Sequence, residues 1–220
     1  MRRVCHPYWM ECAGLAALLA VILLFAWLPV PMPPGSDIAF ARTVLRGMTM
    51  GRLNGAVPAV PRIQISAWQR LAEPGDVLVF HNPHCAYGYW SHAVLYAGGG
   101  WVIDATDFVR GTTLRPLSVF QYYEKAALLR PAVPAAVRRQ SARIAQAYVG
   151  RMYDPFAPLS DDRRQYCSKL VWTAYRRAGV TLCPPKAWIV PDDLYQSRLL
   201  QVVAKAGGPA GDGAAGPKEG

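Results

Sequence analysis

Three consecutive glycines, Gly98–Gly100, are the feature that most constrains the fold of this chain. Residues 91–97 before them and residues 101–106 after them are rich in apolar, aromatic and β-branched residues, which is typical of strands. A glycine-rich turn between two such segments predicts an antiparallel hairpin. A further strand is predicted over residues 77–80, directly after the turn signal Pro74-Gly75-Asp76. The sequence therefore predicts an antiparallel sheet in this part of the chain.

The length of the hairpin loop decides whether His92 and Asp104 can interact. A three-residue loop pairs Ala97 with Trp101, and in that register Asp104 lies diagonally opposite His92 on the same face, within side-chain reach. A two-residue loop turns Asp104 to the opposite face. The sequence leaves both lengths open. The rival carboxylate Asp107 has the wrong parity in the first register.

Cys167 begins a segment with the periodicity of an amphipathic helix, about 3.6 residues per repeat. The helix is predicted to stop at Gly179, and this spacing places Cys167 in its first turn on the inward face, with Lys169 and Thr173 on the polar side. The unsatisfied N–H groups and the positive end of the helix dipole favour a thiolate at that position. A small buried cysteine without a catalytic role fits the position on its own equally well.

Together, Cys167, His92 and Asp104 are predicted to supply the three parts of a thiol nucleophile site. In this hypothesis His92 takes the proton of Cys167, and Asp104 orients the imidazole and stabilises its charged form. Considered alone, His92 would be a satisfied, half-buried histidine and Asp104 a solvated carboxylate at a strand end. The histidine precedes the cysteine in the chain, which is the reverse of the papain order.

An ordered series of short motifs carries a family resemblance. The motifs are Gly75-Asp76-Val77-Leu78, Ser91-His92-Ala93-Val94-Leu95-Tyr96, Val102-Ile103-Asp104-Ala105, Tyr153-Asp154, Tyr166-Cys167-Ser168-Lys169-Leu170-Val171-Trp172 and Pro191-Asp192-Asp193-Leu194. In this order they resemble the permuted papain-like YiiX/YaeF amidases of the NlpC-like cysteine peptidase superfamily, in the circularly permuted branch that also contains the lecithin:retinol acyltransferase group. The resemblance covers roughly residues 70–204. It implies a catalytic Cys167, a catalytic His92 and a polar third residue at Asp104.

Two features depart from these relatives. The YiiX/YaeF pattern usually has glutamate at the third position, where this chain has Asp104, and the acyltransferase group has an Asn-Cys-Glu-type motif that Tyr166-Cys167-Ser168 does not match. The resemblance therefore favours a cysteine hydrolase, amidase- or peptidase-like, that cleaves an amide or ester bond in a peptide or lipid. The alternative is a non-catalytic, membrane-tethered lipid- or peptide-binding protein on the same fold.

The predicted fold class is α+β: a circularly permuted papain-like (NlpC-like) fold in which an antiparallel sheet packs against helices, with an N-terminal transmembrane helix. Further helices are predicted over residues 133–150 and from Pro191 onward. The predicted organisation is an N-terminal cytoplasmic segment (1–12), a transmembrane anchor (13–31), a linker and lead-in helix (32–69), the hydrolase domain (70–204) and a disordered tail (205–220).

The predicted anchor is an uncharged apolar run, Ala13–Val30, of about the length that crosses a bilayer as a helix. Arg2 and Arg3 precede this run and Trp27 lies near its far end, which favours a cytoplasmic N-terminus. The predicted location is therefore the bacterial inner membrane, in a single pass, with a periplasmic catalytic domain. A cleaved signal peptide is the alternative, but its Ala-x-Ala site, Ala39-Phe40-Ala41, lies far beyond the run.

Charge and cysteine content restrict the partners and cofactors. The net charge of +10 comes from scattered arginines without a concentrated aromatic and basic stretch, so no nucleic-acid partner is predicted. A disulfide between Cys85 and Cys183 is open in an exported domain. His81, His84 and Cys85 resemble half of a zinc site, but only Cys183 follows as a further ligand. No metal or other cofactor is predicted.

Overall fold

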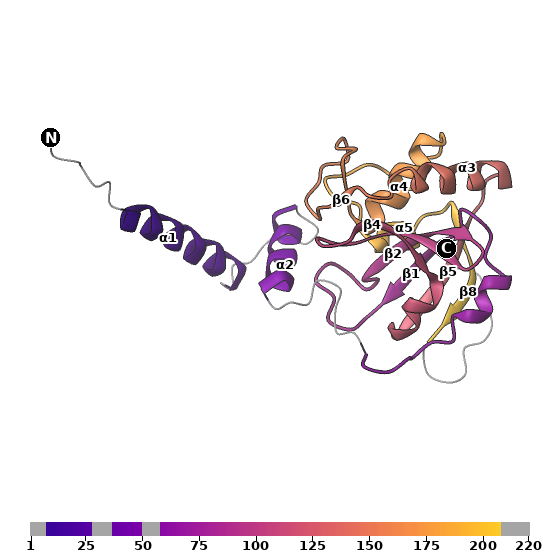
Figure 1. Cartoon of the computed structure of the whole chain (residues 1–220), viewed down its shortest axis with the longest axis horizontal. Coiled ribbons are helices and arrows are strands. Elements are labelled where there is room, and N and C mark those ends of the chain that lie inside the picture. The colour runs from indigo at the N-terminus through magenta and orange to yellow at the C-terminus, as the bar shows by residue number, and fades with distance from the viewer. Residues whose placement is uncertain (1–7, 28–36, 50–57, 208–220) are drawn as a thin grey trace. The chain divides into compact units, whose positions relative to one another are not determined.

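The computed structural model describes residues 8–27, 37–49 and 58–207, and the chain divides into two units, Met1–Gly51 and Arg52–Gly220 (Figure 1). The first unit contains two helices, α1 (Tyr8–Trp27) and α2 (Asp37–Thr49). Most large apolar side chains of α1 between Leu15 and Trp27 are exposed. The second unit contains every strand of the described residues and all three residues of the predicted site.

The N-terminal helix differs from the predicted anchor. The sequence predicts a membrane-spanning helix over residues 13–31, whereas α1 begins at Tyr8 and ends at Trp27, and residues 28–31 lie outside the described part of the chain. Among the helices of the described residues, none has the length and apolar character needed to cross a membrane. The transmembrane part of the predicted fold class is therefore not supported.

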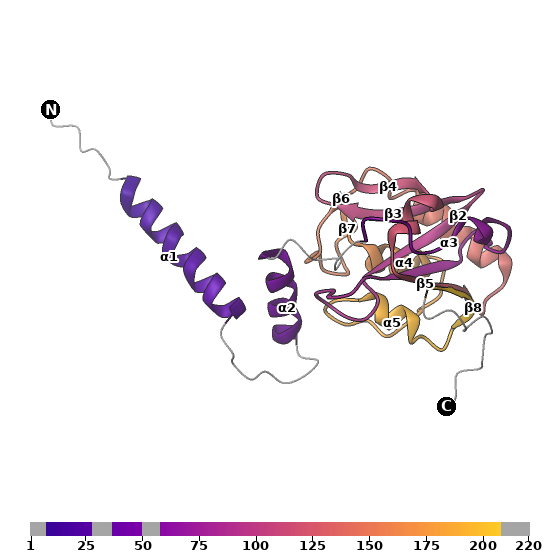
Figure 2. The ribbon, with the colours of Figure 1, turned by 90° about the horizontal axis from the view of Figure 1, so that it is seen from below.

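A six-stranded sheet, with every neighbouring pair antiparallel, forms the centre of the second unit. The strand order is β4-β3-β2-β1-β5-β8, with β4 and β8 at opposite edges (Figure 2). The strands are β1 (Val77–His81), β2 (His92–Gly98), β3 (Trp101–Asp107), β4 (Gly111–Pro116), β5 (Lys125–Pro131) and β8 (Leu200–Ala206). The first three match the predicted strands. The last contains residues 205 and 206, which were predicted to belong to the tail, and residues 208–220 lie outside the described part.

Helices cover one face of this sheet (Figure 1). These are α3 (Ala135–Gln146) and α4 (Cys167–Arg177), followed in the chain by the short α5 (Pro191–Tyr195). Leu170 and Val171 of α4 share one buried apolar cluster with Leu95 and Ile103 of the sheet. The antiparallel sheet and its packed helices confirm the α+β prediction.

The opposite face carries two short 3-10 helices, η1 (Ser66–Arg70) and η2 (Leu117–Tyr122). Trp68 and Phe120 from these helices pack with Phe80 and Tyr96 in a second buried cluster. The remaining pair of strands, β6 (Met152–Tyr153) and β7 (Arg164–Gln165), is parallel and separate from the main sheet. β7 ends two residues before Cys167, so this pair fixes the chain that enters α4.

The hairpin between β2 and β3 combines a two-residue turn with a β-bulge, and the two together decide which face Asp104 occupies. Its turn has two residues, because β2 ends at Gly98 and β3 begins at Trp101. The register shifts at Ala97, where one extra residue forms a β-bulge. The bulge cancels the one-residue difference in loop length. Beyond it, the strands pair as they would across a three-residue loop, and Asp104 keeps the face of His92.

The prediction that Lys169 and Thr173 lie on an exposed polar side of α4 is wrong. All residues of α4 from Cys167 to Tyr175 are buried, including Lys169 and Thr173. The Lys169 ammonium donates hydrogen bonds to the carbonyl oxygens of Asp161 and, at 2.7 Å, Arg164. Burial lowers the pKa of Lys169 to about 8. The loop before α4 covers the side that periodicity assigns to solvent, and it uses the lysine as a hydrogen-bond donor.

Candidate active site

Cys167 is the first residue of α4, and its side chain is buried. The first hydrogen bond of the helix runs from the Leu170 N–H to the Tyr166 carbonyl oxygen, so the N–H groups that precede Leu170 have no acceptor within the helix. These groups and the helix dipole stabilise negative charge at this end of α4. The position predicted for Cys167 from periodicity is therefore confirmed.

The residues on both sides of Cys167 are fixed to one segment, at Ile189. The Ser168 hydroxyl donates to the Ile189 carbonyl oxygen at 2.6 Å, and the Ile189 N–H donates to the Tyr166 hydroxyl oxygen at 3.1 Å. Ile189 itself is buried. Because both neighbours are held, the backbone at Cys167 has little freedom to rotate its side chain away from the sheet.

His92 and Asp104 form a buried pair. The distance between His92 Nε2 and Asp104 Oδ1 is 2.7 Å, and the side chains are 3% and 0% exposed. The sequence predicts that these two residues meet, on the condition of a particular register, and the structure brings them together through the bulge at Ala97. Asp107, the rejected rival, instead accepts from the backbone N–H groups of Val109 and Arg110 in the turn after β3.

The second oxygen of Asp104 is also satisfied. Asp104 Oδ2 accepts hydrogen bonds from Thr106 Oγ1 and from Arg115 Nη1, both at 2.9 Å. Burial by itself raises the pKa of Asp104, but His92 and Arg115 hold it below its ordinary value. The carboxylate therefore stays ionised although no solvent reaches it.

Neither Thr106 nor Arg115 was identified from the sequence. A signal for Arg115 exists in β4: Thr113 pairs with Asp104, and Arg115 lies two residues further along the same face. A residue at that diagonal position is within reach of a long side chain. The position of Arg115 could be used only after β4 and its register were known. The sequence of residues 111–116 does not by itself predict a strand.

The remaining ring nitrogen of the histidine is available for chemistry. His92 Nδ1 is buried and has no hydrogen-bond partner among the described residues. Burial by itself lowers the pKa of His92, but Tyr123 and Asp104 raise it well above its ordinary value. The imidazole is therefore held ready to carry a proton.

The imidazole of His92 lowers the pKa of the Cys167 thiol. Burial by itself raises the pKa of Cys167, but the interaction with His92 and a hydrogen bond from the Ala93 backbone N–H lower it below its ordinary value. These opposite shifts in pKa favour a thiolate beside a charged imidazole. The structure thus brings together all three residues that the sequence singled out, Cys167 with His92 and His92 with Asp104.

Aromatic residues enclose the pair. The His92 ring stacks near Phe120 and Tyr123, with ring centroids 5.9 and 6.2 Å apart. Burial raises the pKa of Tyr123, and it raises the pKa of Tyr153 well above its ordinary value. Burial therefore disfavours the ionised form of both phenols.

The other two cysteines of the second unit are thiols in the structure. Cys85 and Cys183 form no disulfide, so the pairing left open by the sequence does not occur in this structure. Burial raises the pKa of each to about 11. Trp172 Nε1 donates to the Cys183 carbonyl oxygen at 3.0 Å. Cys183 therefore behaves as a packed core thiol, in contrast to Cys167.

The loop considered as half of a zinc site has other contacts. His81 Nδ1 lies 2.6 Å from the Tyr89 carbonyl oxygen, and its Nε2 lies 3.6 Å from Glu124 Oε2. Within residues 8–27, 37–49 and 58–207, no group of three or more His, Cys, Asp or Glu side chains lies close enough together to hold a metal ion.

The arrangement has the parts needed for covalent catalysis by a thiol. A thiol of lowered pKa lies at a helix start, a histidine with one free ring nitrogen lies beside it, and a buried carboxylate holds the other nitrogen. Backbone N–H groups at the start of α4 are placed to receive negative charge on a carbonyl oxygen. Such a site can transfer an acyl group to its cysteine and then to water.

Comparison with known proteins agrees with this description. The model of the family described as "Permuted papain-like amidase enzyme, YaeF/YiiX, C92 family" matches residues 73–192. A solved structure, that of the metalloprotein yiiX from Escherichia coli O157:H7 (DUF1105), is similar with a TM-score of 0.50 and 20% sequence identity, over 60% of this chain and 97% of that chain. At this identity the similarity shows a shared fold. No curated protein matches the sequence.

Proposed function

Because this chain belongs to the permuted papain-like amidase family, YaeF/YiiX, we propose that it is a cysteine hydrolase that cleaves an amide or ester bond through Cys167, His92 and Asp104. The observation that carries the proposal is the buried 2.7 Å pair of His92 Nε2 and Asp104 Oδ1, which leaves His92 Nδ1 unbonded. A solely structural histidine would be expected to have both ring nitrogens satisfied.

In the first half of the proposed reaction, His92 Nδ1 takes the proton of the Cys167 thiol. The thiolate attacks the substrate carbonyl carbon and forms a C–S bond, while the carbonyl electrons move to oxygen. The Cys167 backbone N–H donates a hydrogen bond to this oxyanion. Collapse of the tetrahedral intermediate breaks the C–N or C–O bond, and His92 donates its proton to the leaving amine or alcohol.

The second half releases the acid. Water enters, His92 takes one of its protons, and the resulting hydroxide attacks the thioester carbonyl carbon. Collapse of the second tetrahedral intermediate breaks the C–S bond and yields a carboxylic acid. The proton held by His92 returns to the Cys167 thiolate, and the site is restored.

Asp104 acts on the imidazole throughout. Its carboxylate fixes the proton on Nε2, so that Nδ1 is the nitrogen presented to Cys167, and it stabilises the imidazolium that forms after each proton transfer. Arg115 and Thr106 hold Asp104 in turn, at 2.9 Å each. We assign them positioning roles, because neither is in contact with the proposed reacting atoms.

The similar Escherichia coli structure is described as that of a metalloprotein. The described residues of this chain offer no cluster of three or more metal-binding side chains, so they do not fit such a site. The proposed mechanism therefore uses the side chains of the protein alone and routes no step through a metal ion.

We further propose that the enzyme works at a membrane, on the periplasmic side of the bacterial inner membrane, on a peptide or lipid substrate. The exposed apolar side chains of α1 support association with lipid. Cell fractionation followed by protease treatment of spheroplasts tests this proposal. A protein recovered with the membrane and digested only after the outer membrane is opened would support it, and recovery in the cytosol would contradict it.

The hydrolase proposal is tested with the full chain and a matched pair of variants. Wild type, Cys167→Ala and the core-thiol control Cys183→Ala are incubated with a lipid extract and with cell-wall fragments, and products are compared by mass spectrometry. Products that form with wild type and Cys183→Ala but not with Cys167→Ala are expected. If a folded wild-type protein binds components of either mixture without any product, the non-catalytic binding alternative is correct.

A further inference from the structure

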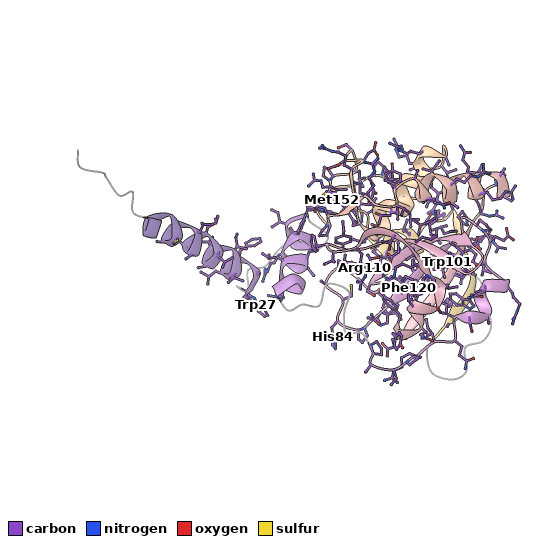
Figure 3. The ribbon with its side chains drawn as sticks, viewed as in Figure 1. Trp27, His84, Trp101, Arg110, Phe120 and Met152 are labelled. Atoms are coloured by element: carbon purple, nitrogen blue, oxygen red, sulfur yellow. The ribbon has the colours of Figure 1, made fainter. Side chains whose placement is uncertain are left out.

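The turn between β3 and β4 exposes apolar side chains that the proposed reaction does not use. Phe108 is 61% exposed and Val109 is 95% exposed. Met152, at the start of β6, is 67% exposed. We define these three residues, with Arg110 and Arg151, as the hairpin patch; Figure 3 labels Met152 and Arg110. Large apolar side chains gathered in the open mark an interaction surface more often than isolated ones do.

Close backbone contacts make the patch one surface. The Thr112 N–H donates to the Arg151 carbonyl oxygen at 2.8 Å, and the Gly150 N–H donates to the Thr112 carbonyl oxygen at 2.8 Å. Gly111 has a φ of +64°, and a Cβ at this position would lie 2.4 Å from the Arg151 carbonyl oxygen. Only glycine allows the turn to approach residues 150–152 this closely.

The tip of the β3–β4 turn, residues 108–110, is held in place by hydrogen bonds. Asp107 Oδ1 accepts hydrogen bonds from the Val109 and Arg110 N–H groups at 2.9 and 2.8 Å, and Asp107 Oδ2 lies 2.6 Å from Arg110 Nη1. The turn is therefore ordered by its own bonds, and they leave Val109 pointing into solvent. A preorganised apolar tip can be buried on binding without a large loss of conformational entropy.

Positively charged side chains border the apolar residues of the hairpin patch. Arg110 is 62% exposed in its side chain and forms an ion pair with Asp107 of the same turn. Arg151 is exposed and takes part in no ion pair among the described residues. The chain as a whole carries a net charge of +10. An apolar tip with arginines at its border matches a lipid surface whose acyl chains accept the tip and whose anionic headgroups pair with the guanidinium groups.

The patch is connected directly to the proposed active site. The Phe108 ring meets the Tyr153 ring edge-on, with centroids 5.2 Å apart and an interplanar angle of 81°. Tyr153 pairs with Gln165 of β7, two residues before Cys167. Asp104 lies in the middle of β3, the strand that leads to this turn. A surface bound at the patch would therefore contact elements that adjoin the proposed active site.

From these contacts we propose that the hairpin patch docks onto the surface of an anionic lipid bilayer and so presents the active site to substrates held in or at the bilayer. The role given to docking rests on the proposed hydrolase function. Docking itself can be measured without substrate turnover. It adds a second membrane contact, in the catalytic unit, to that proposed for α1.

Hydrogen–deuterium exchange on the full chain tests the proposal, because it reports on the hairpin separately from α1. The amides of residues 108–111 are followed without lipid, with phosphatidylcholine vesicles, and with vesicles that contain phosphatidylglycerol. We expect exchange to slow at least fivefold on the anionic vesicles alone. Val109→Asp should abolish this protection, whereas Val60→Asp, at a valine that is 55% exposed outside the patch, should retain it. Arg151→Gln should lower the ratio of docked to free hairpin about fivefold.

Three results would overturn the proposal: exchange unaffected by anionic vesicles, equal protection with Val109→Asp, or protection produced by a soluble protein fraction but not by vesicles. The Cys167→Ala variant separates this proposal from the enzymatic one. Hairpin protection that persists in Cys167→Ala supports docking independently of catalysis. A protein that hydrolyses its substrate without hairpin protection retains the proposed function and loses this inference.

Discussion

His92 Nε2 lies 2.7 Å from Asp104 Oδ1, although the turn that joins their strands has the length that would separate them. The bulge at Ala97 restores the shared face. Deletion of Ala97 would therefore change the geometry of the site without altering a proposed catalytic side chain. Bulges next to active sites commonly serve this purpose, since they re-aim side chains within a regular sheet.

The first prediction concerns the reactivity of two buried cysteines. The pKa of Cys167 is lowered by His92, whereas burial raises that of Cys183 to about 11. Cys167 should therefore reach its maximal alkylation rate below pH 9, while the rate at Cys183 should still rise above pH 9. At pH 7.5, iodoacetamide should modify Cys167 at least about tenfold faster, because the higher pKa of Cys183 leaves a much smaller fraction of that thiol ionised. The lower nucleophilicity of the more acidic thiolate offsets only part of this difference.

Peptide mapping by mass spectrometry gives both rates in one sample. Cys167→Ala should remove the fast reaction and leave the slow one, and Cys183→Ala should do the reverse. Equal rates at the two positions across the pH range would contradict the assignment of Cys167 as an activated thiol.

The second prediction concerns Asp104. Asp104→Asn removes the charge that raises the pKa of His92, so the pKa of the imidazole should fall and that of Cys167 should rise. The alkylation profile of Cys167 should move to higher pH, and turnover of any substrate identified should fall about 10²–10⁴-fold. Asp104→Glu retains the charge and should keep part of the activity. An unchanged alkylation profile in a folded Asp104→Asn protein would argue against the orienting role.

The third prediction links Lys169 to stability. Its folded-state pKa is lowered to about 8, from 10.5 for an ordinary lysine, so between these values the unfolded chain binds more protons than the folded one. Stability should therefore rise with pH in this window, by about 1–2 kcal/mol between pH 8 and pH 9.5. Urea unfolding across this range measures the slope.

Lys169→Met is the matched comparison, because it keeps the apolar stem and removes the ionisable group. The variant should be less stable overall, since the carbonyl groups of Asp161 and Arg164 lose their donor. Its stability should nevertheless depend less on pH than that of wild type. Identical pH slopes for the two proteins would refute the buried-lysine explanation.

The fourth prediction separates backbone conformation from steric contact at two glycines. Gly111 and Gly179 both have positive φ, +64° and +85°, but a Cβ at Gly111 would meet Arg151 O at 2.4 Å, whereas nothing lies within 4 Å at Gly179. Gly179→Ala should destabilise the protein by about 1 kcal/mol, and Gly111→Ala by about 2–4 kcal/mol because the contact adds to the same strain. Urea midpoints compare them directly, and equal losses would show that the contact relaxes freely.

Local patterns predicted the elements that carry the proposed nucleophile and base. The segment from Cys167 has a helical period, and the segments around His92 and Asp104 read as strands, because each pattern is contained within a few neighbouring residues. Strands β4, β5 and β8 were not predicted, since β4 alternates weakly and the segment of β8 was divided between a helix and the tail. These strands owe their conformation to the neighbours with which they pair.

By itself, the sequence determined the order of the motifs, the family they indicate, and the placement of Cys167 at a helix start with His92 on an upstream strand. Only the tertiary structure decided that Asp104 meets His92, that Arg115 supports Asp104, and that Lys169 is buried. The physical reason is the range of the interactions. Periodicity is a property of adjacent residues, whereas register, bulges and burial are set by contacts between segments far apart in the chain.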